Sequence, residues 1–256
     1  MKSITNLRRR KILEYIQSNQ RGEVSYFAQQ YKVSEVTIRN DLNKLERKGC
    51  LTRCYGGARL NRQFVFERPF GEKKQMQCKI KAKLGEYAAS LINNGDKIIL
   101  DSGSTLEQVA LNLDDKNDLV VMTNGINIAY HLANKNNLSL MLTGGFMRSN
   151  SYSICGSMGE EFLSEYHFNT FFLGVDGFDK SLGITTPHQA EANINRKMLE
   201  AAQNVIAVTD SSKFNRQSFC MIAHPKQLNM LITDSGIPQD YYNELTTQGI
   251  DVRIVD

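Results

Sequence analysis

The chain of 256 residues carries 41% hydrophobic and 23% charged residues, which excludes wholesale disorder and allows one large domain or two smaller ones. It has no run near the length of a transmembrane helix and no apolar signal core at its N-terminus, so we expect neither a membrane protein nor a secreted one. The net charge of +4 divides unevenly, because residues 1–83 hold 20 Lys/Arg against 7 Asp/Glu, whereas residues 84–256 hold 11 against 20. A polyanion-binding segment and a solvated, highly charged helix are equal alternatives for the basic part.

The first predicted elements are three short helices within residues 7–49. Apolar residues at helical spacing mark the first helix, whose region ends at Gly22. The second is predicted over Tyr26–Tyr31, with Ser25 as its N-cap. The third begins after Ser34, which is also a capping residue. Its apolar residues recur at i, i+4 and i+7, namely Ile38, Leu42 and Leu45.

A β-hairpin is predicted next, because the extended stretches Leu51–Tyr55 and Ala58–Leu60 flank Gly56-Gly57. Three short helices and a basic hairpin are the outline of a winged helix-turn-helix. In that fold the third helix fits a DNA major groove about 12 Å wide, where its outward polar residues meet base edges. The hairpin would offer phosphates three arginines, which are Arg53, Arg59 and Arg62.

The second part of the chain reads as an α/β domain. A linker is predicted over residues 61–72 and a long amphipathic helix over Lys73–Leu91. Near-continuous apolar strands then alternate with helices, which predicts a mostly parallel sheet covered on both faces. The predicted strands are residues 97–100, 119–122, 138–142, 170–175, 205–209, 230–233 and 252–255. The predicted helices are residues 105–113, 127–133, 158–166, 189–202 and 239–247.

Glycine- and hydroxyl-rich segments follow five of the predicted strands, at the edge where open α/β sheets bind ligands. They are Asp101–Thr105, Thr123–Gly125, Thr143–Gly145, Asp176–Gly177 and Asp210–Lys213. Glycines let the backbone approach closely and helix N-terminal N–H groups attract anions, so these loops favour a phosphate-bearing ligand, with Lys213 as a compensating charge. Asp101, Asp176 and Glu191 suit the hydroxyls of a sugar or an amino group on it. The alternative is that Gly and Ser only make turns and caps here.

Histidines and cysteines show no metal-ligand spacing, so we expect no metal and no cofactor. The four histidines are interpreted as satisfied or exposed side chains. The five cysteines include no C-x-x-C pair and are interpreted as reduced thiols of a cytoplasmic protein. Cys50 and Cys54 are interpreted as small packing residues, and a redox role for them is left open.

Two sets of motifs resemble the DeoR family of bacterial sugar-metabolism repressors, over essentially the whole chain. The first set comprises Ser34–Leu42, Leu45-Glu46, Gly49 and Arg53–Ala58. The second set comprises Leu100–Thr105, Met122–Gly125, Leu142–Gly145, Leu173–Asp176 and Thr209–Phe214. Members of the family often carry a second Arg or Lys where Asn40 stands. This departure leaves the operator sequence open, since Asn can read adenine bidentately.

The resemblance implies a winged helix-turn-helix DNA-binding domain in residues 1–60, a linker in residues 61–72 and an α/β effector domain in residues 73–256. It implies a repressor of a sugar or amino-sugar catabolic operon, released from double-stranded operator DNA by a phosphorylated sugar or amino sugar. A homodimer or homotetramer is expected, since operators are usually read by symmetric oligomers. The expected location is the cytoplasm, at the nucleoid when the protein is bound to DNA.

The effector domain of the family resembles sugar-phosphate isomerases, so an isomerase- or deaminase-like enzyme is the alternative. Those isomerases use an acidic base at a place resembling Glu191 and a lysine before a glycine-rich turn. Here Leu182 precedes Gly183, and Lys180 lies two residues earlier. Leucine cannot polarise a developing enediolate oxygen. We therefore expect a site that binds its ligand without catalysis.

The residues expected at the two sites complete the prediction. The DNA contacts are expected from Arg9, Ser34, Thr37, Arg39, Asn40, Lys44, Arg53 and Arg59. The effector contacts are expected from Asp101, Ser102, Gly103, Ser104, Thr105, Asn124, Gly144, Gly145, Asp176, Glu191 and Lys213. The phosphate is expected on Ser102–Thr105 with Lys213 near it. The helix of residues 73–91 is the expected transmitter, because it links the two domains.

Overall fold

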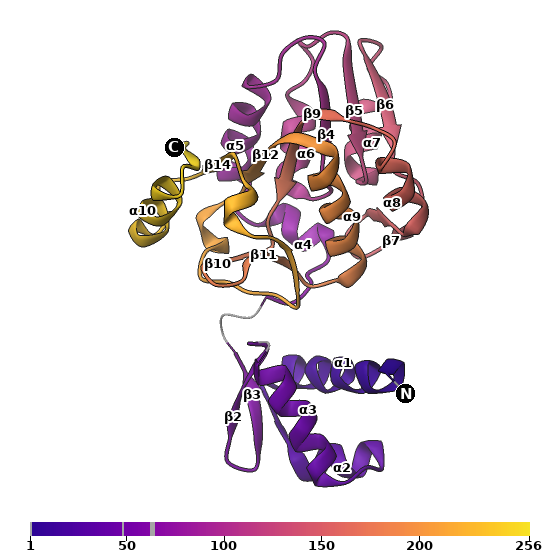
Figure 1. Ribbon diagram of the computed structural model, residues 1–256, viewed down its shortest axis with the longest axis vertical. Helices are drawn as coiled ribbons and strands as arrows, with labels where there is room; N and C mark the ends of the chain where they lie inside the picture. Colours follow the sequence, from indigo (N-terminus) through magenta and orange to yellow (C-terminus); the bar gives the residue numbers. More distant parts are fainter. Residues whose placement is uncertain (1, 48, 62–64) are drawn as a thin grey trace.

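The computed structural model describes residues 2–47, 49–61 and 65–256, and its N-terminal part is a winged helix-turn-helix (Figure 1). The elements of this part are α1 (Lys2–Asn19), β1 (Arg21–Glu23), α2 (Val24–Tyr31), α3 (Glu35–Arg47), β2 (Leu51–Cys54) and β3 (Gly57–Leu60). The three strands pair antiparallel in the order β1-β3-β2. One apolar cluster joins the helices and the sheet, and its fully buried members include Ile16, Phe27, Ile38 and Leu42. The periodicity of α3 therefore identified its buried face correctly.

Two details of this part differ from the sequence prediction. Helix α2 begins at Val24 with Glu23 as its N-cap, so Ser25 lies inside the first turn instead of capping it. Gly22 does not follow a helix end but sits in the short strand β1. A Cβ at Gly22 would lie 2.4 Å from the Phe27 ring, so glycine is required there by packing. A strand of three residues is too short for its periodicity to be recognised.

The predicted helix over Lys73–Leu91 is two helices in the structure, α4 (Phe70–Gln75) and α5 (Cys78–Ser90). The break lies at Gln77, whose φ of 54° is in the left-handed region. Amphipathic spacing continues on both sides of the break, which is why the sequence pattern did not reveal it.

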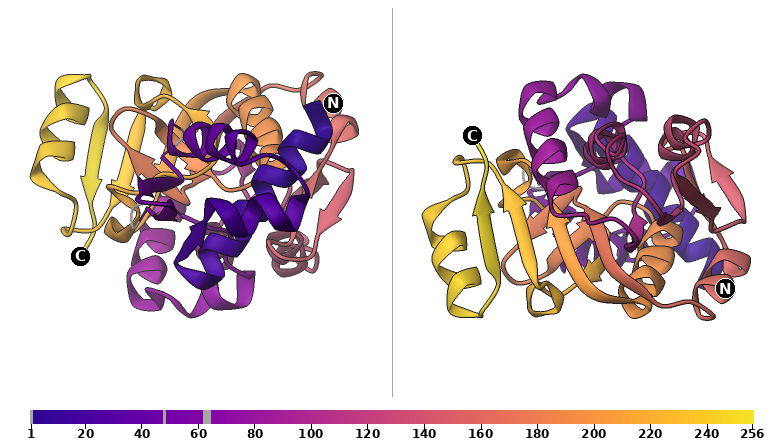
Figure 2. Two further views of the ribbon diagram at one scale, coloured as in Figure 1. Left: turned by 90° about the horizontal axis from the view of Figure 1, so that it is seen from below. Right: turned by 90° about the horizontal axis from the view of Figure 1, so that it is seen from above.

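A seven-stranded parallel sheet forms the C-terminal part, with strand order β15-β14-β12-β9-β4-β5-β6. Its strands are β4 (Lys97–Leu100), β5 (Leu119–Thr123), β6 (Leu138–Leu142), β9 (Phe168–Gly174), β12 (Ala202–Val208), β14 (Met230–Thr233) and β15 (Asp251–Ile254). Helices cover both faces, as the two views along the sheet show (Figure 2). One apolar cluster joins the sheet to α5, α6 (Ser104–Leu111) and α7 (Ile126–Leu132). Another joins it to α8 (Ser157–Leu163), α9 (Gln189–Ala201) and α10 (Gln239–Thr247).

Short strands that the sequence did not predict accompany the main sheet. Strand β7 (Phe146–Arg148) pairs with β8 (Ser153–Cys155). Strands β10 (Gly177–Asp179), β11 (Gly183–Thr186) and β13 (Cys220–Ala223) form a second small sheet. Two 3₁₀ turns, η1 (Ser211–Lys213) and η2 (Pro225–Gln227), complete the elements. Within the described ranges, no helix has the length and apolarity that crossing a bilayer requires.

The two parts of the molecule touch through the chain that follows η1. The Gln217 side-chain amide donates to the carbonyl of Gly49, directly after α3, over 3.1 Å. The Gln217 carbonyl accepts from the amide of Val65 at 2.6 Å, and the Ser218 hydroxyl donates to the Val65 carbonyl at 2.8 Å. The segment that leads out of the winged part is thus fixed on the α/β part through the backbone N–H and carbonyl of Val65.

Candidate functional site

Helix α3 presents a polar surface on the side opposite to its buried residues. Arg39, Asn40 and Lys44 are exposed there, as the sequence predicts. The Ser34 hydroxyl accepts from the backbone N–H of Thr37 over 3.2 Å, so it caps this helix. Arg39 forms an exposed ion pair with Glu35, 2.9 Å long. Such pairs contribute about 0–1 kcal/mol, so a DNA phosphate or base can replace Glu35 as the partner of Arg39.

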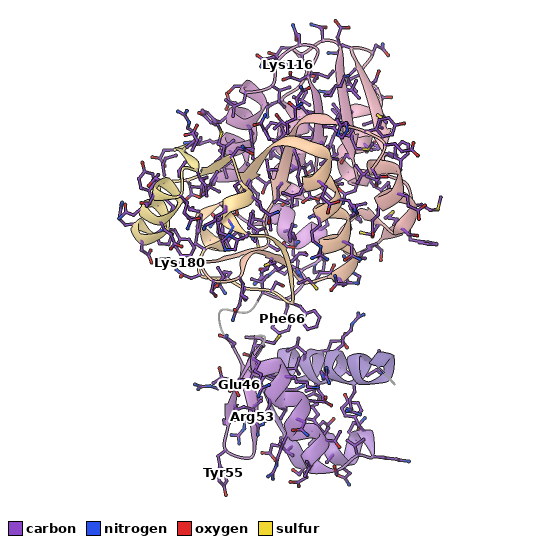
Figure 3. All side chains as sticks on the ribbon, viewed as in Figure 1. Glu46, Arg53, Tyr55, Phe66, Lys116 and Lys180 are labelled. Atoms are coloured by element: carbon purple, nitrogen blue, oxygen red, sulfur yellow. The ribbon has the colours of Figure 1, made fainter. Side chains whose placement is uncertain are left out.

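The β2–β3 hairpin is held against α3 by Arg53. Its Nε donates to the Gly57 carbonyl over 3.0 Å, and a terminal nitrogen donates to Asn43 Oδ1 over 2.6 Å. Tyr55 stands at the tip of the hairpin with its side chain fully exposed (Figure 3). The sequence pattern places Tyr55 at the end of a strand and therefore does not predict that it stands at the hairpin tip. Arg59 is exposed on the same hairpin, whereas Arg62 lies outside the described residues.

Two arginines of α1 converge on one buried carboxylate of α3. Asp41 is 2% exposed and pairs with Arg8 at 2.6 Å and with Arg9 at 2.7 Å. A buried carboxylate requires such partners, because desolvation penalises its charge. The structure therefore places Arg9 in an ion pair that joins α1 to α3, and its contact with a DNA phosphate stays a prediction.

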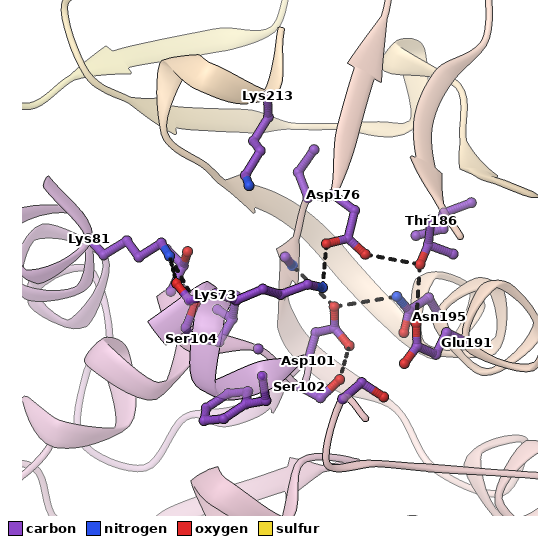
Figure 4. Close-up of a pocket in the computed structure, with 18 residues that line it drawn as sticks. Lys73, Lys81, Asp101, Ser102, Ser104, Asp176, Thr186, Glu191, Asn195 and Lys213 are labelled. Carbon is purple, nitrogen blue, oxygen red and sulfur yellow. Dashed lines mark hydrogen bonds and ion pairs between the residues drawn. The ribbon is translucent and has the colours of Figure 1, made fainter. Parts of the chain in front are cut away.

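A polar pocket lies beyond the carboxyl ends of strands β4 and β9 (Figure 4). Its volume is about 660 Å³ with its open mouth. Eight of the predicted effector residues line it, namely Asp101, Ser102, Gly103, Ser104, Thr105, Asp176, Glu191 and Lys213. Strand ends and helix starts far apart in the sequence are thus brought to one cavity, as the sheet edge predicts.

One end of the pocket is built for an anion. The first turn of α6 lines it, and the N–H groups of a first turn have no partner in their own helix. Lys213 points into the cavity from η1 (Figure 4). Lys81 of α5 reaches the same end and donates to the Ser104 hydroxyl over 3.0 Å. Burial, followed by the neighbouring Lys213 cation, lowers the pKa of Lys81 to about 8.

Lys81 is a pocket residue that sequence reasoning missed. Its side chain is 4% exposed, which is rare for lysine. The signal was present in the sequence, because Lys81 shares the helical stripe of Leu84, Gly85 and Ala88, all of which are buried. A lysine on an apolar stripe indicates a polar partner in the interior.

The opposite end of the pocket is acidic and holds Asp101, Asp176 and Glu191. Burial raises the pKa of Asp101 to about 8, and the Glu191 and Asp176 carboxylates add to the shift. The Asn195 amide nitrogen donates to Asp101 over 3.3 Å. The other amide atom, Asn195 Oδ1, is buried without a hydrogen-bond partner in the part of the chain that the structure describes. This end of the pocket therefore offers hydrogen-bond acceptors to donor groups of a ligand.

Lys73 of α4 occupies part of the acidic end. Its ammonium lies 2.6 Å from Asp176 Oδ1. Burial alone would raise the pKa of Asp176, but the Lys73 cation outweighs it and lowers this pKa. The hydroxyl of Thr186 lies 3.1 Å from Asp176 Oδ2 and 3.2 Å from Glu191 Oε2. One threonine therefore connects the two carboxylates. Sequence reasoning missed Thr186 because β11 was not predicted.

Glu191 is tied to the rest of the molecule by Arg148 of β7. One guanidinium nitrogen lies 2.5 Å from Glu191 Oε1, and the other lies 2.6 Å from Glu67 Oε1. The Ser153 hydroxyl also donates to Glu191, over 2.7 Å. Since Glu67 belongs to the segment between the two parts, Arg148 connects that segment with the pocket.

Three residues predicted at the effector lie outside the pocket lining. Asn124 supports the pocket loop from beneath, since its side-chain oxygen accepts from the Ser102 N–H over 2.8 Å. Gly144 and Gly145 have φ values of 75° and 119°. A Cβ at Gly145 would lie 2.5 Å from the carbonyl oxygen of Cys155, so glycine allows β7 and β8 to approach. Direct contact of these three residues with an effector stays a prediction.

Lys180, the lysine nearest to the position that an isomerase would use, lies outside the pocket lining. Its ammonium pairs with Asp240 of α10 at 2.6 Å and lies 5.0 Å from the centre of the Tyr241 ring. Among the described residues, no group of three or more His, Cys, Asp or Glu side chains is arranged to hold a metal ion.

Comparison with known proteins assigns both parts of the chain. Residues 8–64 match the DeoR-like helix-turn-helix domain, and residues 76–235 match the DeoR C terminal sensor domain. The chain is 38% identical to the "Putative aga operon transcriptional repressor" of Escherichia coli O157:H7, over 98% of this chain and 94% of that protein. It is 32% identical to the transcriptional repressor GlcR of Bacillus subtilis, over 96% and 94%. It is 31% identical to the L-fucose operon activator of Haemophilus influenzae, over 92% and 94%.

Comparison with solved structures gives matches at low sequence identity and low TM-score. Ribose 5 phosphate isomerase A from Neisseria gonorrhoeae is 16% identical, with a TM-score of 0.40 and coverage of 54% of each chain. The "Probable sor Operon Regulator" from Shigella flexneri is 14% identical, with a TM-score of 0.45, over 80% of this chain and 97% of that chain. Likeness at this level carries no conclusion about function.

The winged fold, the polar α3 surface and the match to named regulators agree with one another. The chain carries a DeoR-like helix-turn-helix domain and its relatives are named as transcriptional regulators, so the protein is a regulator rather than an enzyme. The chain belongs to the DeoR family of transcriptional regulators, with an N-terminal helix-turn-helix that binds DNA and a C-terminal sensor domain.

Proposed function

We propose that this regulator represses a sugar or amino-sugar catabolic operon and leaves its operator when a phosphorylated sugar fills the pocket. The observation that carries the proposal is the polarity of that pocket. Lys81, Lys213 and a helix N-terminus stand at one end. The carboxyl groups of Asp101, Asp176 and Glu191 stand at the other, where Lys73 pairs with Asp176. A sugar phosphate has the matching polarity, with an anion at one end and hydrogen-bond donors at the other.

The anionic end of the ligand is assigned to the first turn of α6. Lys81 and Lys213 bring two cations to this turn, whose N–H groups point along the positive end of the helix dipole. Lys81 is already hydrogen-bonded to Ser104, so its ammonium is positioned before any ligand arrives. A phosphate would also restore the full charge of Lys81, because an anion offsets both burial and the repulsion from Lys213.

The sugar end of the ligand is assigned to Asp101, Asp176, Glu191 and Asn195. All of these offer oxygen acceptors, so hydroxyl or amino groups are the chemistry that satisfies them. An amino group has the additional advantage of positive charge beside the carboxylates of Asp176 and Glu191. Relatives named "Putative aga operon transcriptional repressor" and "L-fucose operon activator" support a sugar-linked operon.

The DNA-reading surface is assigned to α3 and the hairpin. We propose that Ser34, Thr37, Arg39, Asn40 and Lys44 lie in or beside the major groove, and that Arg9, Arg53 and Arg59 contact phosphates. Domain boundaries at residues 60 and 72, a homodimer or homotetramer and a cytoplasmic location complete the proposal. Relatives include both a repressor and an activator, so the sign of regulation is itself proposed, and we propose repression.

A thermal-shift screen tests the ligand class. We expect stabilisation by galactosamine-6-phosphate, N-acetylgalactosamine-6-phosphate or a tagatose phosphate, because a ligand that binds only the folded chain raises its melting temperature. The unphosphorylated sugars serve as controls and should give no shift at the same concentration. A wild-type chain that ignores every phosphorylated sugar, or responds equally to the unphosphorylated ones, would contradict the proposal.

A matched pair of lysine variants connects binding with the pocket. Lys213→Met should abolish the thermal shift, because the cation at the phosphate end is lost. Lys226→Met removes an exposed lysine on η2, outside the pocket, and should keep the shift. A normal response of Lys213→Met would remove Lys213 from the site.

A further inference from the structure

The acidic end of the pocket already holds a cation of the chain itself. Lys73 lies on α4, three residues after the helix begins at Phe70. Its ammonium lies 2.6 Å from Asp176, and the two side chains are only 20% and 17% exposed. Asp176 Oδ2 in turn lies 3.1 Å from the Thr186 hydroxyl. Both oxygens of this carboxylate are therefore engaged before a ligand enters.

The segment that carries Lys73 is the one that leads from the winged part, and it is fixed on the α/β part at successive points. Val65 pairs with Gln217 and Ser218. The Phe70 N–H donates to the Asn150 carbonyl over 2.8 Å, and its ring lies 4.9 Å from that of Tyr152. Two further attachments, Glu67 through Arg148 and Lys73 through Asp176, are ion pairs that end on pocket carboxylates.

We infer that Lys73 is an internal competitor of the effector, and that its displacement from Asp176 frees the segment that holds the winged part in its DNA-binding position. This inference rests on the proposed function. A donor group of the sugar needs the same carboxylate oxygen that the Lys73 ammonium occupies. The Lys73 ammonium fills the position in the pocket beside this oxygen, so a sugar donor that takes the same position displaces the lysine.

Displacement of Lys73 has a mechanical consequence, because a half-buried ammonium cannot stay in the pocket without its partner. The backbone carbonyl of Lys73 accepts a hydrogen bond from the Lys81 ammonium, so α4 is connected to the phosphate end as well. A phosphate that draws the Lys81 ammonium toward itself weakens this second attachment. Both ends of a sugar phosphate therefore act against the same helix.

The direction of the effect follows from linkage. A ligand shifts an equilibrium only by its preference for one of the two forms. The form with Lys73 on Asp176 disfavours the sugar, and in this mechanism it is the form that binds DNA. Removing the lysine should therefore weaken DNA binding and strengthen sugar binding at the same time.

The experiment compares Lys73→Met with Lys73→Arg and Lys74→Met. Lys74 is the matched control, because it is the next residue, carries the same charge and pairs with Glu107 outside the pocket lining. Fluorescence anisotropy measures affinity for a duplex that the wild-type chain selects from a random-sequence library. Calorimetry measures the affinity of the DNA-free protein for galactosamine-6-phosphate.

We expect Lys73→Met to lower duplex affinity at least tenfold without any sugar and to tighten galactosamine-6-phosphate binding at least threefold. Lys73→Arg and Lys74→Met should stay within twofold of wild type in both measurements. Weaker sugar binding by Lys73→Met would make Lys73 a contact of the ligand and overturn the inference. Unchanged affinities in both measurements would overturn it as well.

Two further readouts keep the result decisive. If Lys73→Met does not fold, as judged by circular dichroism, Lys73→Gln takes its place, since it keeps a hydrogen-bond donor but has no charge. If the wild-type chain binds no sugar phosphate, the proposed function fails, and the duplex measurement alone decides the inference. A duplex affinity that is independent of Lys73 then counts against it.

Discussion

Glu67 and Glu191 accept hydrogen bonds from opposite nitrogens of a single guanidinium, that of Arg148. Glu67 belongs to the segment between the two parts of the chain, and Glu191 lines the pocket. A planar, forked guanidinium holds two carboxylates at fixed directions, whereas a lysine ammonium is a point charge at the end of a flexible chain. A single side chain, that of Arg148, therefore separates the pocket from the connecting segment, so a ligand that moves Glu191 also acts on Glu67.

Arg148→Lys should weaken the coupling between sugar and DNA while the pocket keeps its charge. We expect the ratio of duplex affinities without and with galactosamine-6-phosphate to fall about fivefold, a loss on the order of 1 kcal/mol of coupling. Anisotropy titrations measure the ratio. Arg253→Lys alters an exposed ion pair on β15 and is the control. A full response in Arg148→Lys would show that the bridge is not needed.

Asp101→Asn should stabilise the protein, and the gain should grow with pH. Burial raises the pKa of Asp101 from 3.8 to about 8, so between these values the folded chain binds more protons here than the unfolded chain. The free energy of unfolding of wild type therefore falls as pH rises through this window, whereas Asn cannot titrate. We expect the difference between variant and wild type to increase by on the order of 2–3 kcal/mol from pH 5 to pH 8.

Urea unfolding at the two pH values measures this difference. Asp115→Asn, at an exposed carboxylate, should show none of the increase. A difference that stays constant from pH 5 to pH 8 would mean that Asp101 is ionised in the folded chain.

Asp41→Asn should destabilise the winged part. The carboxylate is buried and holds Arg8 and Arg9, so its loss removes the ion pairs between α1 and α3. The arginines keep some access to water, and we therefore expect a loss of about 1–3 kcal/mol, below the value for a fully buried pair. Glu14→Gln breaks the exposed pair with Arg10 and should cost less than about 0.5 kcal/mol. Equal effects of the two substitutions in urea unfolding would refute the distinction.

Arg39→Ala and Arg59→Ala should weaken DNA binding in different ways. Arg39 stands on the exposed face of α3, and its loss should cost about 1–3 kcal/mol on the selected duplex but little on unrelated DNA. Arg59 stands on the hairpin, and its loss should weaken both and reduce the slope of log affinity against log salt by about 1. Salt titrations with both duplexes separate the two roles. Galactosamine-6-phosphate binding should remain unchanged in both variants.

Local patterns were sufficient for most of the framework. Ser34 caps the recognition helix where hydroxyl chemistry predicts, and the apolar runs at Lys97–Leu100 and Met230–Thr233 are strands at those bounds. Asp101 and Asp176 meet in one pocket because each follows a strand of the same parallel sheet. Helix periodicity and strand order are short-range or topological signals, and a single sequence carries both.

What could not be predicted depends on partners far along the chain. Gln77 interrupts a helix that the neighbouring residues favour, and the hydrophobic spacing around it does not indicate the break. Thr186 reaches the pocket only because β11 pairs with β10 and β13. Lys73 was assigned to a connecting helix, since its partner Asp176 lies more than a hundred residues away. Such contacts are properties of the assembled fold.

The connections between pocket and winged part run along the rim of the α/β part, through Arg148, Lys73 and the chain around Gln217. The seven parallel strands beneath hold these residues in place and take no direct part in the contacts. The contacts that connect the pocket with the winged part are thus made by residues outside the strands. A substitution in the strands changes the fraction of folded protein, whereas a substitution at Arg148 or Lys73 changes how DNA binding responds to the ligand.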